Sequence, residues 1–249
     1  MLWFDQPSIK VRTKSELVFE HYCREHCYRT ERIEPEANAG RSPDYRVITP
    51  AGRVIVEIKE FTPNEDDKQF VEGLKKLGHA AYQRTLGKRV RKAIQDAASQ
   101  LRRYKATLFP EVLLLYDNIY DNPKLDGDWP FARNEYLEPL AIKAAMFGSP
   151  QLRFTLDCNK TAIDPTGSSH GGGRQLTETQ RLYIGAVAVL TETIATRSFQ
   201  IDFFHNFFST IPVFPKYFQH PSDRHFVKSD HPERTGWGWA EFVGDRQTT

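Results

Sequence analysis

Residues 45–61 constrain the fold more than any other stretch of the chain, because they predict two strands joined by a tight turn. Side chains alternate between the two faces of a strand, so Glu57 and Lys59 share one face while their apolar neighbours take the other. A carboxylate and an ammonium on an otherwise apolar strand are costly to bury without partners. Asp44, just before the first strand, adds a second carboxylate. A divalent hard cation such as Mg²⁺, which takes oxygen ligands, fits between such groups.

The order of these charged residues carries a family resemblance. Pro43-Asp44 is followed by a twelve-residue spacer and then by Glu57-Ile58-Lys59. This pattern resembles the PD-(D/E)xK nuclease superfamily, which includes many restriction enzymes, Holliday-junction resolvases and RecB-like nucleases. The resemblance implies an α/β fold of the restriction-endonuclease type, a mixed central sheet flanked by helices. It also implies Mg²⁺ or Mn²⁺ held by Asp44, Glu57 and the backbone carbonyl of Ile58, with Lys59 orienting or deprotonating the attacking water.

A helix is expected ahead of the Pro-Asp motif. Thr13 and Ser15 are residues that cap helices, and apolar residues recur after them with a helical period. In the family that the chain resembles, such a helix often carries a glutamate that helps to hold the metal. Glu16 takes that place here as a catalytic and metal-binding candidate, with Glu20 one turn later as the alternative. Either could instead be an ordinary solvated glutamate in a first helical turn.

A second helix is expected over residues 88–105, where apolar residues form one stripe with helical spacing. Gln100 and Tyr104 lie four residues apart and so share a helix face. Gln-x-x-x-Tyr after Glu-x-Lys resembles a further signature of RecB-like nucleases, where the motif lies beside the active site and helps to bind DNA. Gln95 could fill the glutamine role in a shifted register, and Tyr104 could equally pack in the core.

Positive charge is concentrated on this helix. Residues 84–105 hold eight lysines and arginines against one acid, Asp96, in a chain whose net charge is only +2. Such clustering favours a polyanion bound at one face, although a solvated helix surface is the alternative. The predicted nucleic-acid contacts are Arg89, Arg91, Lys92, Gln95, Gln100, Arg102, Arg103 and Tyr104.

The remaining sequence is expected to extend the same domain. We assign residues 1–249 to a single nuclease domain with its core at 13–117, and 118–249 to an elaborated C-terminal extension or a small accessory region. Strands are expected near 112–116, 152–156, 186–190 and 199–204, with a helix over 134–147 and a polar insertion at 61–87. The tail histidines, including His225, match no metal-ligand spacing and predict a solvated loop.

The resemblance covers roughly residues 16–116 and implies a Mg²⁺- or Mn²⁺-dependent deoxyribonuclease. An endonuclease acting in transposition, recombination, restriction or phage defence is expected, either as a homodimer or in a larger DNA-processing complex. The alternatives are a nucleic-acid-binding module that keeps the fold without the chemistry, and an enzyme of another class. No secretory signal or apolar run of membrane-spanning length is present, so we expect a cytoplasmic location and no membrane partner.

Overall fold

The structure, a computed structural model, describes residues 12–34, 42–80, 85–102, 108–119, 134, 136–148, 150–156, 162–170, 174–193, 198–228 and 239–242. Within these ranges, no helix has the length and apolar character needed to cross a membrane. The elements in chain order are α1 (Lys14–Glu25), β1 (Arg29–Arg32), β2 (Tyr45–Thr49), β3 (Gly52–Phe61), α2 (Glu65–Leu77), α3 (Lys88–Leu101), β4 (Glu111–Asp117), α4 (Pro139–Phe147), β5 (Pro150–Leu156), β6 (Ala162–His170), β7 (Ile184–Thr193), β8 (Ser198–His205), the 3₁₀ helix η3 (Pro215–Tyr217), β9 (Arg224–Lys228) and β10 (Trp239–Glu241).

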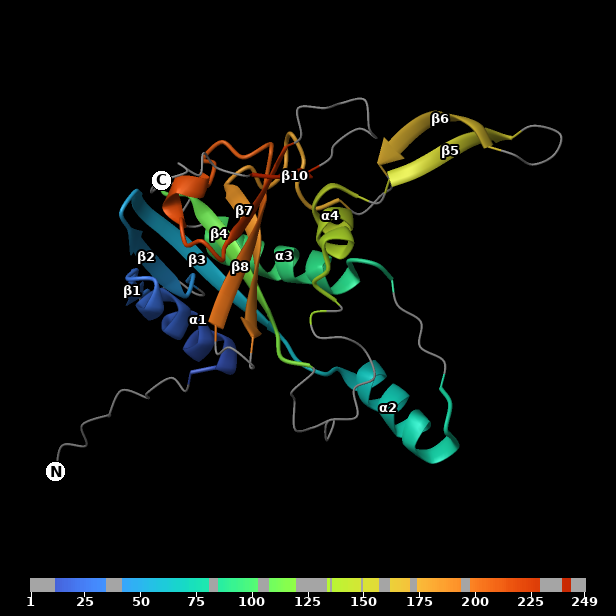
Figure 1. Cartoon of the computed structure of the whole chain (residues 1–249), viewed down its shortest axis with the longest axis horizontal. Helices are drawn as coiled ribbons and strands as arrows, with labels where there is room; N and C mark the ends of the chain where they lie inside the picture. Colours follow the sequence, from blue (N-terminus) through green and yellow to red (C-terminus); the bar gives the residue numbers. More distant parts are fainter. Residues whose placement is uncertain are drawn as a thin grey trace.

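In the described part of the chain, eight strands form one mixed sheet in the order β1-β2-β3-β4-β7-β8-β9-β10 (Figure 1). A separate antiparallel ribbon, β5 and β6, projects from the body. β3 pairs antiparallel with β2 and parallel with β4, and β4 pairs parallel with β7. The chain is therefore an α/β protein with a mixed sheet flanked by helices, as the sequence predicts.

The β2–β3 hairpin fixes which face each residue of β3 takes. The turn ends at Gly52, whose φ of +138° is a conformation that side chains rarely adopt. Tyr45 lies opposite Val56, so the pairing covers the first half of β3. Beyond the turn, the predicted alternation is confirmed, because two different clusters bury the two sets of apolar side chains. The set facing α1 is Val54, Val56 and Ile58, and the set facing α3 is Ile55 and Phe61.

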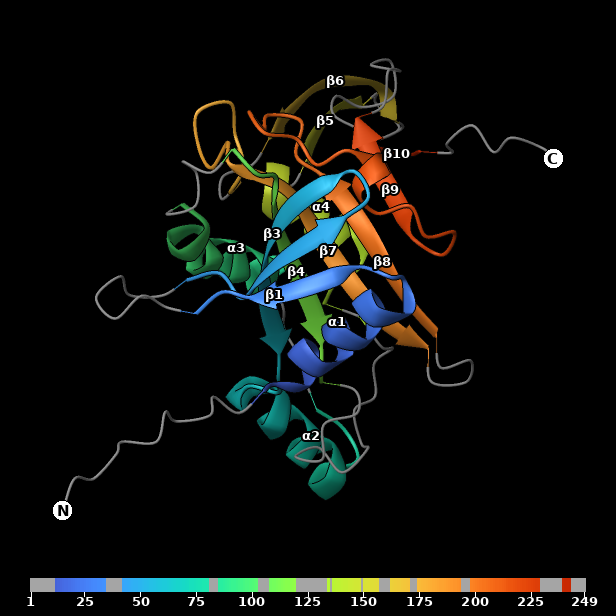
Figure 2. The ribbon, with the colours of Figure 1, turned by 90° about the vertical axis from the view of Figure 1, so that its left-hand side faces the viewer.

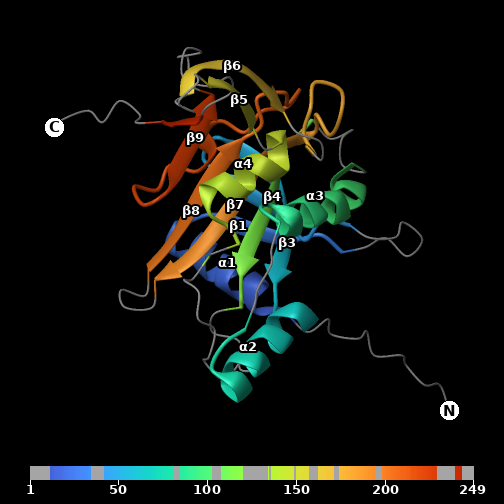
Figure 3. The same cartoon turned by 90° about the vertical axis from the view of Figure 1, so that its right-hand side faces the viewer.

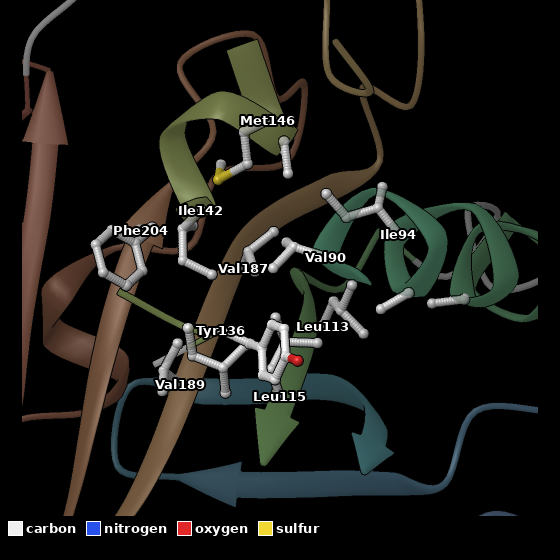
Figure 4. Close-up of a cluster of buried hydrophobic side chains, with 14 of the residues drawn as sticks. Val90, Ile94, Leu113, Leu115, Tyr136, Ile142, Met146, Val187, Val189 and Phe204 are labelled. Carbon is white, nitrogen blue, oxygen red and sulfur yellow. The ribbon is translucent and has the colours of Figure 1, made fainter. Parts of the chain in front are cut away.

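Helices cover both faces of the sheet. α1 lies against one face and buries Phe19 and Tyr22 there (Figure 2). α3 and α4 lie against the other face (Figure 3). Figure 4 shows how Val90 and Ile94 of α3 meet Leu113 of β4 in this second cluster. The predicted apolar stripe of the basic helix is thus confirmed, and its opposite face is left to polar and charged side chains.

α2 lies within the segment predicted as a polar insertion, and it projects beyond the sheet (Figure 1). A buried acid at its start attaches it to the body. The Asp67 carboxylate accepts a hydrogen bond from the Tyr136 hydroxyl at 2.6 Å and forms an ion pair with Arg89. The Arg89 guanidinium also lies over the Tyr136 ring, 4.3 Å from its centre. These contacts hold the first turn of α2 beside the first turn of α3.

Two sequence expectations differ from the structure. The helix predicted over 134–147 begins at Pro139, a residue that suits the first helical turn because it has no N–H to leave unpaired. The tail around His225 is not a solvated loop, because residues 224–228 form β9 beside β8. His225 is buried, and its Nδ1 lies 3.0 Å from Nε2 of His205. Pairing with β8 therefore orders this polar segment as a strand.

Glu111 at the start of β4 leads to a prediction about stability. Its side chain is fully buried, and neither carboxylate oxygen has a hydrogen-bond partner in the described structure. Burial raises the pKa of Glu111 from 4.5 to about 8. The folded protein then keeps this proton between pH 4.5 and 8 while the unfolded chain releases it, so this group costs stability as pH rises through that window.

Glu111→Gln should remove that cost. Its free energy of unfolding relative to wild type should rise with pH, by at most about 1.4 kcal/mol per unit between pH 4.5 and 8. Urea unfolding at about pH 5, 6.5 and 8 measures the difference. An equal difference at all three pH values would show that Glu111 is ionised in the folded protein.

Candidate active site

Glu57 and Lys59 lie on the face of β3 that α3 covers. β4 pairs with β3 at both positions, whereas the pairing with β2 ends at Val56, so both residues lie just beyond the β2–β3 ladder. Glu57 is only 1% exposed, whereas the Lys59 side chain is 24% exposed. The lysine therefore reaches from the buried carboxylate toward solvent.

Asp44 lies directly before β2 and reaches across to β3. Its Oδ2 accepts a hydrogen bond of 2.8 Å from the Ile58 backbone N–H. The β2–β3 ladder ends at the pair Tyr45–Val56, so the Asp44 side chain serves a backbone group that lies beyond the last paired residue. This contact fixes the Asp44 carboxylate beside Glu57.

A buried amide completes the arrangement around Lys59. The Lys59 ammonium donates to Glu57 Oε1 at 2.5 Å and to Gln100 Oε1 at 2.8 Å. Gln100 in turn donates through Nε2 to the Ser42 carbonyl at 3.1 Å. The structure thus brings together Asp44, Glu57, Lys59 and Gln100, four residues that the sequence singled out.

Glu57 is a buried carboxyl group whose charge Lys59 offsets only in part. Its pKa is raised from 4.5 to about 8, first by burial and next by the charge of Asp44, while Lys59 opposes the shift. Glu57 Oε2 is buried and has no hydrogen-bond partner in the described structure. A cation close to both carboxylates would relieve both features.

The donors fit a hard divalent cation in part. Mg²⁺ commonly takes one or two carboxylates and completes its shell with water and substrate phosphate. Asp44 and Glu57 would supply the carboxylates, and the Ile58 carbonyl is the candidate backbone ligand. In the described part of the chain, no group of three or more Asp, Glu, His or Cys side chains is arranged to hold a metal.

Glu16, the predicted third acid, is engaged elsewhere. Its carboxylate accepts from the Thr13 backbone N–H at 2.7 Å in a capping box at the start of α1, and it pairs with Arg32 at 2.8 Å. The other candidate, Glu20, accepts from the Tyr45 hydroxyl at 2.8 Å. Both glutamates belong to the helix on the opposite face of the sheet from Glu57, so the structure does not bring them to Asp44 and Glu57.

A groove of about 950 Å³ opens beside Lys59. The end of β3, the beginning of α2, the first half of α3 and the start of α4 supply its walls. Cationic residues of α3 and polar residues of the β3–α2 connection line it, together with four acids, Glu60, Asp66, Asp96 and Glu138. The cations and amide from α3 are Lys88, Arg89, Arg91, Lys92 and Gln95, and the polar residues from the connection are Thr62 and Asn64.

The predicted nucleic-acid contacts fall into several groups. Arg91, Lys92 and Gln95 line the groove, although Lys92 also pairs with Asp96 at 3.0 Å. Arg89 is bound to Asp67 and Tyr136, so its main contacts are internal. Arg102 caps the far end of α3 and does not line the groove. Arg103 and Tyr104 lie outside the described residues.

Sequence reasoning missed the second wall of the groove. The start of α2 has a signal that could have found it, because Asn64 and Asp67 form a capping box, a pattern that marks helix N-termini. The contact of Tyr136 with Asp67 has no such signal, because it joins residues 69 positions apart.

No protein-family model, curated protein or solved structure matches the chain. The function is therefore inferred from the geometry of the site.

Proposed function

We propose that the chain is a Mg²⁺- or Mn²⁺-dependent nuclease that hydrolyses phosphodiester bonds in DNA. One observation carries the proposal: Asp44 and Glu57 lie beside Lys59, which itself lines a groove where α3 presents four lysines and arginines. Carboxylates suit a divalent ion, and the clustered cations of α3 suit a polyanion. The two features meet at Lys59, which belongs to both.

The element order also supports the resemblance to the PD-(D/E)xK superfamily. A helix precedes the Pro-Asp motif at the start of β2, and Glu-x-Lys lies within the buried strand β3. The basic helix α3 and the apolar strand β4 follow. The sequence predicts this order, and the sheet places β4 beside β3.

In the proposed mechanism, Asp44 and Glu57 would hold the cation and the groove would orient the DNA backbone. When bound, the ion would offset charge on the scissile phosphate and lower the pKa of a nearby water. The Lys59 ammonium would orient the attacking water by donating a hydrogen bond to it and would offset charge developing on the phosphate. Gln100 and Glu57 hold its ammonium at the groove.

The second candidate is a module that binds nucleic acid without cleaving it. Two observations favour it: Glu16 is committed to Thr13 and Arg32, and Lys59 already occupies one Glu57 oxygen. A site with two carboxylates could bind metal too weakly for catalysis. The groove would keep its affinity for DNA in either case.

Cleavage of supercoiled and linear DNA by the purified chain in Mg²⁺, Mn²⁺ or EDTA tests the proposal. We expect cutting with the ions and none in EDTA, and loss of the circle would identify internal cleavage. Salt-sensitive binding without cutting under all conditions would leave the binding module. Neither cutting nor binding would overturn both candidates.

Arg91→Gln should weaken DNA binding and reduce the slope of log affinity against log salt by about 1, the effect of one phosphate contact. Arg91 lines the groove, whereas Arg24 is exposed on α1 at the opposite face of the sheet. Arg24→Gln therefore removes the same charge outside the groove and serves as the control. Titration of labelled DNA at several salt concentrations measures both slopes, and equal slopes would place the DNA elsewhere.

A further inference from the structure

We propose that Gln100 is a positioning residue for the reaction, joining Lys59 to the turn that carries Asp44, rather than a contact for DNA. The inference rests on the proposed function. It starts from the two hydrogen bonds of one side-chain amide, which link three separate elements of the chain.

Both ends of the amide are engaged inside the protein. Its oxygen accepts from the Lys59 ammonium at 2.8 Å, and its nitrogen donates to the Ser42 carbonyl at 3.1 Å. An ammonium has no acceptor and a carbonyl has no donor, so only one orientation of the amide satisfies both partners. Gln100 is 6% exposed. Burial therefore leaves little of this amide accessible to a phosphate.

The two partners belong to the two halves of the site. Ser42 begins the turn in which Asp44 accepts from the Ile58 N–H. Lys59 follows Ile58 and binds Glu57. Gln100 therefore closes a ring of contacts from the Asp44 turn through β3 to α3 and back. Loss of the amide would leave Lys59 with a single fixed partner and would detach the turn from α3.

A neutral amide suits this position better than an acid. Glu57 already faces Lys59, and its pKa is raised by burial and by Asp44. A carboxylate at position 100 would add a third negative group to a buried site and would face the Ser42 carbonyl, an acceptor, without a proton to donate. Glutamine supplies an acceptor and a donor together without adding charge.

Gln95 offers a matched comparison on the same helix. It is exposed and lines the groove, whereas Gln100 is buried on a different face of α3. The sequence left open which of the two glutamines serves the site. The hydrogen bonds assign Gln100 to Lys59, and Gln95 remains available to a ligand in the groove.

The test compares Gln100→Met, which keeps the shape and removes both hydrogen bonds, with Gln95→Met. We expect Gln100→Met to lower kcat about 10- to 100-fold, as misplaced catalytic groups do, with KM and DNA affinity within about twofold of wild type. Gln95→Met should change KM and leave kcat unaltered. Gln100→Glu keeps an acceptor for Lys59 and should recover part of kcat. Weakened DNA binding with an intact kcat in Gln100→Met would overturn the inference and restore a DNA contact.

A second readout needs no DNA and separates this inference from the proposed function. Lys59 acylation by acetic anhydride, followed by mass spectrometry, should be several-fold faster in Gln100→Met than in wild type, because one acceptor no longer holds the ammonium. The other lysines serve as internal controls. If the wild-type chain cuts no DNA, the proposed function fails and acylation alone decides the inference. Unchanged acylation would show that Gln100 does not hold Lys59.

Discussion

Asp44→Asn is expected to lower metal-dependent DNA cleavage by at least about 100-fold, the scale on which loss of a single electrostatic contributor acts in active sites. The variant keeps an oxygen that can accept from the Ile58 N–H, so the turn and the β2–β3 hairpin should persist. It removes one of the two carboxylates available to the ion. The loss should therefore fall on chemistry while the folded structure and the groove are retained.

Three measurements on Asp44→Asn separate these effects. Initial cleavage rates in Mn²⁺ report the chemistry, DNA titration in EDTA reports the groove, and thermal unfolding reports the fold. Glu25→Gln is the matched control, because Glu25 is an exposed acid at the end of α1 on the other face of the sheet. Comparable rates in Asp44→Asn and wild type would contradict the assignment of the site.

Local patterns predicted the part of the site that lies on single elements. The alternation along β3 placed Glu57 and Lys59 on one face, because side chains two residues apart in a strand point to the same side of the sheet. The apolar stripe of α3 likewise fixed which side of the helix is buried, and with it the side that carries Arg91 and Lys92. Neither inference needed knowledge of distant residues.

The hydrogen-bond partners of Glu16 and Gln100 explain why the sequence did not predict the roles of these two residues. Glu16 has the position of a metal ligand in the sequence pattern, yet the capping box with Thr13 and the pair with Arg32 engage it nearer to its own backbone. The role of Gln100 depends on Ser42 and Lys59, which come from two other segments of the chain. Such convergence is set by how helices pack on the sheet, and no spacing within one element encodes it.

Glu57→Gln is expected to make the metal-free protein more stable at and above neutral pH. The pKa of Glu57 is about 8 in the folded protein against an ordinary 4.5, so the folded state holds a proton that the unfolded chain releases between these values. Stability contributed by this group therefore falls as pH rises through that window. Glutamine does not ionise, so the variant should gain on wild type with increasing pH.

A divalent ion should stabilise wild type more than it stabilises Glu57→Gln. An ion bound by Asp44 and Glu57 competes with the proton on Glu57, so Mn²⁺ should raise the Tm of wild type more at about pH 8 than at about pH 6. Glu57→Gln should lose most of this Mn²⁺-induced shift. Thermal unfolding at both pH values, with Mn²⁺ or EDTA, measures the stabilisation without DNA or turnover.

Glu111→Gln is the control that separates the two roles of a buried carboxyl. Glu111 also has a pKa raised to about 8 by burial, but it has no place in the Asp44–Glu57 site. Glu111→Gln should also become more stable relative to wild type as pH rises. Unlike Glu57→Gln, it should keep the full Mn²⁺-induced shift in Tm. If Glu57→Gln kept that shift as well, the ion would bind elsewhere, and Glu57 would be a buried carboxyl whose cost no ion offsets.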